Sequence, residues 1–349
     1  MVGRHGVRLL AGLLGIAALV GPGAAQETAA PAAVPPPDAP ALAPVTPPAR
    51  LDQQQAETLG VGRDVNERMT VGVDIDGRGP FPFIVDTGAE RTVISSELAR
   101  SLSLRPGRTA TVHSMSEVSE IATVVIPGLR VGNRTTEQIH APALSRENLG
   151  ASGILGVDTL QRQRVTFDFK HRQMTVSPSR GPEEHWPDAD TVVVTGRSLY
   201  GRLVLVDASV DGQRVWVIID TGSAVSVGNM ALRTALARRN RLRDLGQPVH
   251  MVSITGGVIA AEYGFARRIR VGGLDVNNLP IAFADVHPFR QLGLTNRPAL
   301  LLGMDALQLF SRVSVDFPNR RVRVLINDGA MLEMAPPRIA EVGGRRRAS

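Results

Sequence analysis

Apolar residues fall in short, valine-rich runs along most of this chain, and such runs predict β-strands. The Asp-Gly pairs at residues 76–77 and 211–212 each lie between two of these runs, an arrangement that favours tight hairpins. Two segments show helical spacing instead, a short one over residues 97–104 and a longer one over residues 229–242. The pattern therefore predicts an all-β fold, made mainly of strands with a few short helices.

The same order of patterns occurs in both halves of the chain. In each half a hairpin leads into an apolar run that ends in Asp-Thr-Gly. A variable middle, an apolar-apolar-Gly element, a short helix and a closing hairpin follow. The first half carries FIVDTGA at residues 83–89 and ILG at 154–156, and the second carries VIIDTGS at 217–223 and LLG at 301–303. Two copies of one unit predict two similar lobes related by a pseudo-two-fold axis.

Each Asp-Thr-Gly sequence places a carboxylate, Asp86 or Asp220, directly after a run of apolar residues. Because an unpaired charge in apolar surroundings costs several kcal/mol, we expect the two aspartates to lie together and to share one proton. The ionised carboxylate of such a pair can take a proton from water, while the protonated one donates to a scissile carbonyl. The alternative is a structural turn, since Asp-Thr-Gly is also ordinary loop chemistry.

The residues that follow the two aspartates suit this acid–base role. Glycines there allow a tight turn and offer backbone N–H groups to the carboxylates, and the threonines are able to hydrogen-bond across the axis. The hydroxyl of Ser223 is expected to donate to the outer oxygen of Asp220, which would leave the shared proton mainly on Asp86. The supporting candidates are Thr87, Gly88, Ala89, Thr221, Gly222 and Ser223.

These motifs resemble those of the retropepsin-like aspartic proteases, in a bacterial, exported form with two tandem domains. In that family apolar-apolar-Asp-Thr-Gly-Ala/Ser is followed later by apolar-apolar-Gly, and residues 65–327 fit this scheme twice. The resemblance implies two retropepsin-like or pepsin-like β-barrel lobes. It also implies an aspartic endopeptidase that acts on polypeptides through Asp86 and Asp220, without a cofactor or a metal. A monomer is expected because one chain supplies both aspartates, and pairing of each half with another chain is the alternative.

The family covers its substrate with hairpins called flaps, and the two halves differ there. Residues 251–264 form a credible flap in the second half, with Thr255, Gly256 and Gly257 as its candidate tip. The corresponding residues of the first half, 112–125, contain no glycine, so that flap is expected to be stiffer or missing. This departure leaves a second function open, namely a peptide-binding module or periplasmic scaffold with little or no turnover.

The start of the chain predicts export. Arg4 and Arg8 precede an apolar stretch that ends in small residues at 23–25, which is the pattern of a cleaved signal peptide. We expect a periplasmic protein with no stable membrane insertion after cleavage; an uncleaved signal that tethers it to the inner membrane is the alternative. The expected divisions are a signal at 1–25, a disordered Ala/Pro-rich linker at 26–55, the first lobe at 56–180, an inter-lobe linker at 181–190, the second lobe at 191–330 and a basic tail at 331–349.

Composition narrows the chemistry further. The chain contains no cysteine, which excludes disulfides, thiol nucleophiles and Cys-ligated metals. The formal net charge is +6, yet the arginines are scattered in the sequence apart from residues 345–347, so no nucleic-acid partner is expected. The histidines show no metal-ligand spacing. Asp158 and Asp305, two residues after each apolar-Gly element, are interpreted as residues at helix N-termini.

Overall fold

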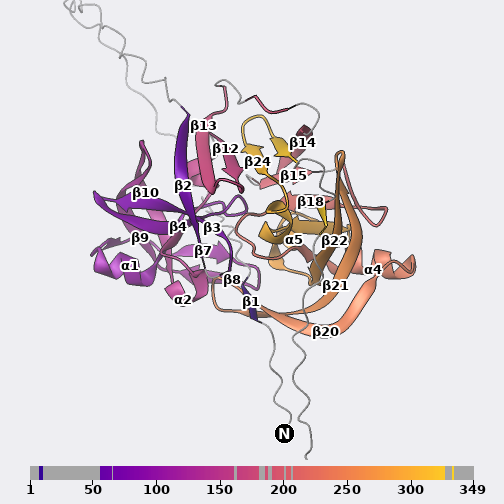
Figure 1. Cartoon of the computed structure of the whole chain (residues 1–349). Coiled ribbons are helices and arrows are strands. Elements are labelled where there is room, and N and C mark those ends of the chain that lie inside the picture. Colours follow the sequence, from indigo (N-terminus) through magenta and orange to yellow (C-terminus); the bar gives the residue numbers. More distant parts are fainter. Residues whose placement is uncertain are drawn as a thin grey trace, which may run out of the picture.

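The computed structural model describes residues 8–10, 56–64, 66–160, 163–180, 185–187, 191–199, 202–205, 207–326 and 332–333. Most of the predicted signal, linker and basic tail therefore lie outside the described residues. Within the described residues the chain is mainly β and forms two lobes that lie side by side (Figure 1). The strands of each lobe curl into a β-barrel, as the sequence predicts.

The first lobe is built from twelve strands and three short helices. They are β2 (Glu57–Arg63), β3 (Met69–Ile75), β4 (Arg78–Val85), β5 (Val93–Ser95), α1 (Ser96–Ser101), β6 (Arg105–Pro106), β7 (Ala110–His113), β8 (Val118–Ile121), β9 (Thr123–Val131), β10 (Arg134–Leu144), α2 (Arg146–Leu149), β11 (Gly153–Leu155), α3 (Val157–Leu160), β12 (Gln163–Asp168) and β13 (Gln173–Pro178).

The second lobe repeats this order. Its elements are β14 (Thr191–Leu199), β15 (Arg202–Leu205), β16 (Ala208–Val210), β17 (Gln213–Arg214), β18 (Trp216–Ile219), β19 (Val227–Gly228), α4 (Met230–Arg238), β20 (Arg243–Val252), β21 (Val258–Val271), β22 (Leu274–Phe283), α5 (His287–Gln291), β23 (Ala299–Leu302), α6 (Met304–Leu307), β24 (Arg312–Asp316), β25 (Arg321–Leu325) and β26 (Leu332–Glu333). Strand β1 (Arg8–Leu10) lies parallel to β20, and β26 lies parallel to β22.

The local signals of the sequence account for the turns and helix ends. Asp76 and Asp211 have φ of 49° and 47°, and the glycine after each is also left-handed, as tight hairpins of this type require. Helix α1 is capped by the hydroxyl of Ser95, which accepts a hydrogen bond from the backbone of Leu98. Helix α4 ends earlier than the predicted 229–242, because the left-handed Asn240 (φ 52°) turns the chain into β20.

Each apolar-Gly element lies beside the strand that carries an Asp-Thr-Gly sequence. In the first lobe β11 runs parallel to β4, with Leu155 opposite Val85, and antiparallel to β5. In the second lobe β23 runs parallel to β18, with Leu302 opposite Ile219, and antiparallel to β19. The two halves therefore share one topology, and in both of them the aspartate follows a strand that is paired in the interior of the lobe.

One sheet joins the two lobes. Its strands follow the order β2–β13–β12–β24–β25–β14, so each lobe contributes three of them, and every neighbouring pair is antiparallel. At the centre of the sheet Thr166 faces Ser314, and the Thr166 hydroxyl donates to the Ser314 hydroxyl at 2.9 Å. This sheet fixes the relative position of the lobes and hence of the two Asp-Thr-Gly loops.

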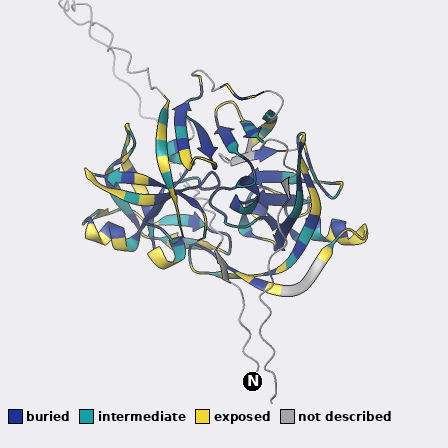
Figure 2. Ribbon diagram, viewed as in Figure 1, coloured by how far each residue is buried: buried dark blue, intermediate teal, exposed yellow. Residues whose placement is uncertain are grey.

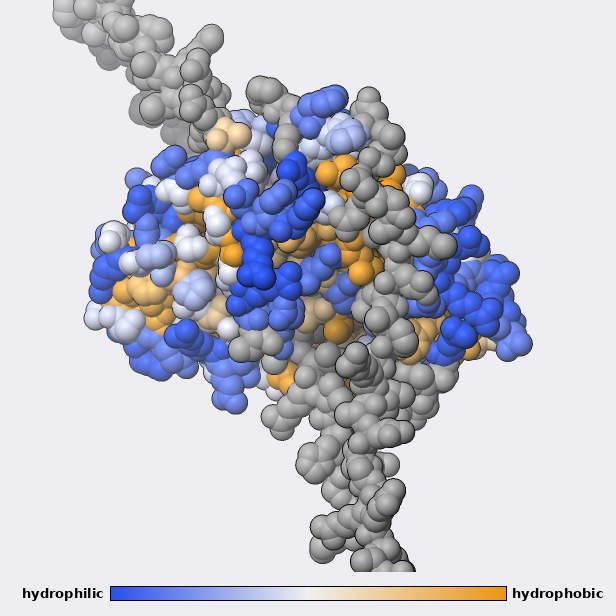
Figure 3. Space-filling model, viewed as in Figure 1, coloured by the Kyte–Doolittle hydropathy of each residue, from blue (hydrophilic) through white to orange (hydrophobic). Residues whose placement is uncertain are grey.

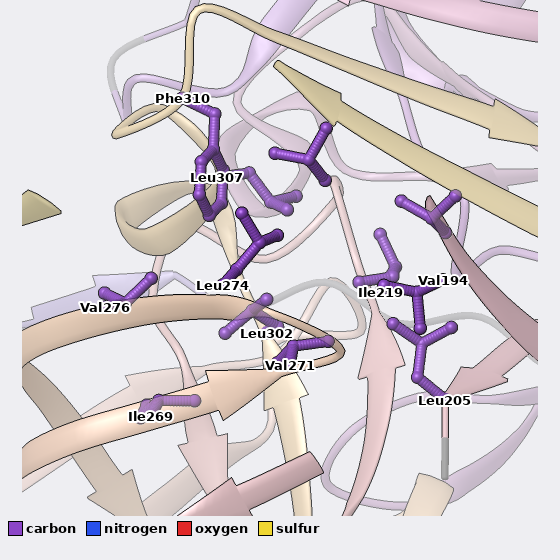
Figure 4. A pocket seen from close by; sticks show the side chains of 12 residues that line it. Val194, Leu205, Ile219, Ile269, Val271, Leu274, Val276, Leu302, Leu307 and Phe310 are labelled. Atoms are coloured by element: carbon purple, nitrogen blue, oxygen red, sulfur yellow. The ribbon is translucent and has the colours of Figure 1, made fainter. Parts of the chain in front are cut away.

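Valine, isoleucine and leucine fill the interior of both lobes, and the buried positions of Figure 2 follow the inner faces of the strands. The core of the second lobe contains an apolar cavity of about 20 Å³ (Figure 4).

Between the lobes Trp186 is buried, and the guanidinium of Arg323 lies 4.4 Å from the centre of its ring, so the inter-lobe segment is anchored at this point. No helix in the described part of the chain has the length and apolarity needed to span a membrane.

Candidate active site

The two Asp-Thr-Gly loops begin where β4 and β18 end. The backbone N–H of Asp86 donates to the carbonyl oxygen of Leu155 at 3.0 Å, and that of Asp220 donates to Leu302 at 3.1 Å. Both aspartates are fully buried. Each loop is thus attached to the apolar-Gly element beside it, and this bond fixes the position of the aspartate at the end of its strand.

The threonines of the two loops join them across the axis. The hydroxyl of Thr87 donates to the carbonyl oxygen of Ile219 at 3.1 Å, and that of Thr221 donates to Val85 at 2.7 Å. Each hydroxyl also accepts a backbone N–H from the opposite threonine, at 3.0 and 3.2 Å. The predicted hydrogen bonds between the threonines are therefore confirmed. The two loops form one rigid unit, since all four bonds are buried.

The two carboxylates lie against this unit. Asp86 Oδ1 accepts the backbone N–H groups of Gly88 at 2.7 Å and Ala89 at 3.0 Å, and Asp220 Oδ1 accepts that of Gly222 at 3.1 Å. The Oδ2 atoms of both aspartates are also buried. A methyl group on Gly222 would overlap the Asp86 carboxylate, so the carboxylate of the first loop lies directly against the second loop. Glycine is required at this position because nothing larger fits.

The predicted role of Ser223 is wrong. Its hydroxyl donates to the carbonyl oxygen of Val225 at 2.7 Å and not to the outer oxygen of Asp220. A serine hydroxyl carries one hydrogen, so this bond uses its only donor. The second loop turns back on itself here, and the Ser223 N–H likewise points to the main-chain oxygen of Asp220, at 3.4 Å. The expected bias of the shared proton toward Asp86 therefore loses its physical basis.

Asp158 and Asp305 lie in the first turns of α3 and α6, as predicted, but they do more than face a helix end. Asp158 accepts the hydroxyl and the backbone N–H of Thr92, and Asp305 accepts the same two groups of Ser226. Burial raises the pKa of both carboxyls, that of Asp305 to about 6, although these hydrogen bonds oppose the shift. A signal for these contacts was present, because a hydroxyl residue follows each loop aspartate by six positions.

Arg68 is a residue of the site that the sequence analysis did not single out. It is fully buried and paired with the equally buried carboxylate of Asp64 through Nε at 2.8 Å. Its guanidinium also donates to the carbonyl oxygens of Leu149 and, at 3.4 Å, Gly222. A cation of the first lobe thus reaches the second Asp-Thr-Gly loop. Only the i,i+4 spacing of Asp64 and Arg68 hinted at the pair.

Both flaps are present. The second is the hairpin of β20 and β21, whose tip contains the left-handed Gly256 (φ 90°). The first is the hairpin of β7 and β8, so the expectation that it could be missing is wrong. Its tip needs no glycine because the Ser114 hydroxyl closes the turn, donating to the carbonyl of Glu117 at 3.0 Å and accepting the Glu117 N–H at 3.2 Å.

The tips of the flaps meet and cross into the opposite lobes. The hydroxyl of Thr255 donates to that of Ser114 at 3.0 Å. Met115, at the first tip, is buried in an apolar cluster of the second lobe, and Ile254, at the second tip, is buried in an apolar cluster of the first. The two flaps are therefore closed against each other and against the opposite lobes.

One pair of histidines also joins the first flap to the second lobe. The Nδ1 atom of His113 lies 2.6 Å from Nε2 of His287, and the two rings are stacked with centroids 4.8 Å apart. The backbone N–H of His287 donates to Met115 of the flap tip at 2.9 Å. No cluster of three or more His, Asp or Glu side chains suited to a metal ion occurs in the part of the chain that the structure describes.

Comparison with known families agrees with this geometry. Residues 71–162 match the family model described as gag-polyprotein putative aspartyl protease, and residues 206–306 match the model described as aspartyl protease. No curated protein matches the chain significantly. The two matched segments each contain one Asp-Thr-Gly loop and its apolar-Gly element, in tandem. The chain therefore belongs to the retropepsin-like aspartic protease family, with two such domains in one polypeptide.

Proposed function

We propose that this protein is an aspartic endopeptidase in which Asp86 and Asp220 together activate a water molecule for attack on a peptide bond. The observation that carries the proposal is the set of reciprocal hydrogen bonds between Thr87 and Thr221. These bonds join the loops so closely that the Asp86 carboxylate lies against Gly222, two residues after Asp220. A structural turn alone would not need two buried carboxylates at one axis.

The chemistry follows from the shared proton. Two carboxylates side by side do not both ionise at low cost, so one is a base and the other an acid. The base takes a proton from water as the water oxygen attacks the peptide carbonyl, and the acid donates its proton to the carbonyl oxygen. Proton transfer to the amide nitrogen then releases the two products. The backbone N–H groups of Gly88, Ala89 and Gly222 hold the carboxylates in place throughout.

The substrate class is extended polypeptide, and the proposed setting is the periplasm. Two flaps that close over the loops suit an extended chain held beneath them, because flap strands offer backbone donors and acceptors to a substrate backbone. The export signal predicted from residues 1–25 supports exported proteins as the physiological substrates.

The decisive experiment compares the wild type with Asp86→Asn and Asp220→Asn on a peptide library. Each substitution should abolish cleavage, by at least about a thousandfold, because both roles of the pair need a carboxyl group. Unchanged unfolding curves would show that the fold is intact. A statine peptide, which mimics the tetrahedral intermediate, should inhibit the wild type, and a chelator should not. Cleavage that survives either substitution would reject the proposed pair.

The second candidate function is a peptide-binding module with little turnover, and one observation favours it. Met115 and Ile254 fill apolar clusters of the opposite lobes, so the closed flaps restrict access to the loops. Isothermal titration of library peptides separates the two functions. An endopeptidase cleaves the peptides that it binds, whereas a binding module retains them uncleaved with the same affinity in the wild type and in Asp86→Asn.

A further inference from the structure

Eight exposed arginines gather at the end of the second lobe that carries α4 and the start of β20, on the side away from the first lobe (Figure 1). They come from three separate segments of the sequence, and Figure 3 shows a rounded, strongly hydrophilic surface at this end. We call this surface the arginine face. It consists of Arg214, Arg238, Arg239, Arg241, Arg243, Arg267, Arg268 and Arg270.

The turn between β16 and β17 brings these segments together. The guanidinium of Arg241 donates to the carbonyl oxygen of Asp211, and that of Arg239 donates to Gly212 at 3.4 Å. From β21, the backbone N–H groups of Arg267 and Arg268 donate to the Asp211 carboxylate at 3.1 and 2.8 Å. The helix end and β21 therefore meet at one turn, with their arginines exposed around it.

Strand register extends the face across the neighbouring sheet. Ser209 of β16 lies opposite Arg214 of β17 on one side and opposite Arg270 of β21 on the other. The three side chains form one row, because directly opposed residues point to the same face of a sheet. Asp207, Ser209, Arg214 and Arg270 also line one shallow depression.

Nearby carboxylates balance only part of the positive charge of the face. Asp275 pairs with Arg270 at 2.8 Å and also attracts Arg268, Asp207 lies in the depression beside Arg214, and the carboxylate of Asp211 accepts two backbone N–H groups. Among the described residues the other arginines of the face make no ion pair with a carboxylate. Some arginines elsewhere do have such a partner, as in the pairs Arg63–Glu67, Arg68–Asp64, Arg130–Asp74 and Arg312–Asp168.

The structure thus changes one conclusion drawn from the sequence. Arginines that are scattered along the chain are clustered in space, so their scatter does not exclude a polyanionic partner. Like charges held together repel one another, and an opposing charged surface removes that cost. Guanidinium groups suit phosphate in particular, because their donors match two phosphate oxygens at once.

We propose that the arginine face docks on the anionic headgroups of a phospholipid membrane. The arginines cover a rounded end formed by a helix terminus, two strands and a turn, so a broad charged surface contacts many of them together. A single extended polymer would instead follow a groove. The predicted export signal also places the protein beside a membrane and away from nucleic acid. The inference does not rest on the proposed peptidase activity.

The test is co-sedimentation of the full chain with vesicles of phosphatidylcholine, with and without phosphatidylglycerol. The readout is the gain in bound protein when phosphatidylglycerol is added, because the apolar N-terminal stretch contributes equally to both. Each arginine near an anionic surface is worth about fivefold in partitioning. The combined variant Arg238→Gln, Arg239→Gln, Arg267→Gln and Arg268→Gln should therefore lose the gain by at least about a hundredfold. The gain in the wild type should fall steeply with salt.

A matched variant of the first lobe is the control. It removes the same charge from exposed positions and should still bind more strongly when phosphatidylglycerol is added. Its substitutions are Arg100→Gln, Arg105→Gln, Arg108→Gln and Arg146→Gln. Equal losses in both variants would show that net charge and not the arginine face is responsible, which overturns the proposal. So would retention of the wild type on heparin or single-stranded DNA together with no gain on phosphatidylglycerol. Peptide cleavage in the absence of vesicles should be unchanged in both variants.

Discussion

Hydroxyl groups join the two Asp-Thr-Gly loops, and the choice has a physical reason. A threonine hydroxyl donates one hydrogen bond and accepts another, so Thr87 and Thr221 each satisfy a carbonyl oxygen and an N–H of the opposite loop. A charged pair at this place would lie beside two carboxylates and would shift their pKa values. Neutral bonds fix the geometry without that disturbance.

Ser223 provides a sharp test at the same scale. Its hydroxyl bonds to Val225, so Ser223→Ala should leave the acidic limb of the pH–rate profile where it is. The substitution should lower the free energy of unfolding by about 1 kcal/mol, since it removes one buried hydrogen bond. Chemical denaturation and a pH series of kcat/KM are the two measurements. An acidic limb that moves toward neutral pH would show that the hydroxyl reaches Asp220 in the working enzyme.

The residues of the site that occur in both copies of the repeat could be predicted from the sequence. Both aspartates and both threonines could be predicted because each occurs at the same place in two copies. Arg68 and the hydroxyl of Ser223 could not be predicted. The bond of Arg68 to Gly222 and that of Ser223 to Val225 depend on how the loop after Asp220 folds back, and no spacing along the chain records that path.

At the scale of elements, the short helices α3 and α6 hold the segments that follow the loops. The Asp305 carboxylate of α6 takes both polar groups of Ser226, and that of Asp158 in α3 does the same for Thr92. Both lobes also form a flap, but they close its turn differently. A glycine forms the turn at the second tip, and the Ser114 hydroxyl closes the turn at the first. A turn closed by a side chain leaves no glycine signal, which is why the sequence predicted the second flap and not the first.

The raised pKa of Asp305 predicts a pH dependence of stability. Burial raises it from 3.8 to about 6, so between these values the folded protein holds a proton that the unfolded chain has lost. Below about pH 4 Asp305 makes its whole contribution to the free energy of unfolding. This contribution, on the order of 3 kcal/mol, is lost as the pH rises through 6. Asp305→Asn should flatten this part of the curve of unfolding free energy against pH.

Urea unfolding at several pH values measures the effect. Asp158→Asn provides the matched comparison, because burial also raises the pKa of Asp158 and the change should have the same sign. A curve for Asp305→Asn that runs parallel to that of the wild type between pH 4 and 6 would contradict the prediction.

The cavity in the second lobe gives a prediction about packing. Side chains of β18, β21, β22 and α6 point into it, Val276 among them (Figure 4). Val276→Ile should raise the free energy of unfolding by about 0.5–1 kcal/mol, because the added methyl group enters existing space. Val276→Ala enlarges the cavity and should lower the free energy of unfolding by about 2 kcal/mol. If both substitutions destabilise the protein equally, the cavity closes in solution.

For the whole molecule, the six-stranded sheet between the lobes is the decisive feature. Each lobe contributes three strands, β12 pairs with β24 across the axis, and the pairing is continuous from β2 to β14. The repeat in the sequence predicted two lobes and their common topology. It did not predict this sheet, because strand order across a pseudo-symmetry axis depends on which edges remain unpaired in each lobe.

The shared sheet predicts activity that does not depend on concentration. Both aspartates belong to one chain, so peptide cleavage per molecule should stay constant on dilution into the nanomolar range. A dimer of identical chains loses activity as it dissociates. Cleavage rates over a dilution series, together with sedimentation at the same concentrations, measure this. Loss of specific activity on dilution would favour the alternative in which each half pairs with a second chain.

Covalent linkage of the lobes also removes a restriction that identical subunits impose. In a symmetric dimer any substitution at the axis appears twice, whereas here Thr166 faces Ser314, and Ala89 in one loop corresponds to Ser223 in the other. The two lobes therefore differ chemically at the axis itself. A symmetric site binds a peptide equally well in either direction, but two unlike lobes are able to distinguish the amino-terminal part of a bound peptide from its carboxyl-terminal part.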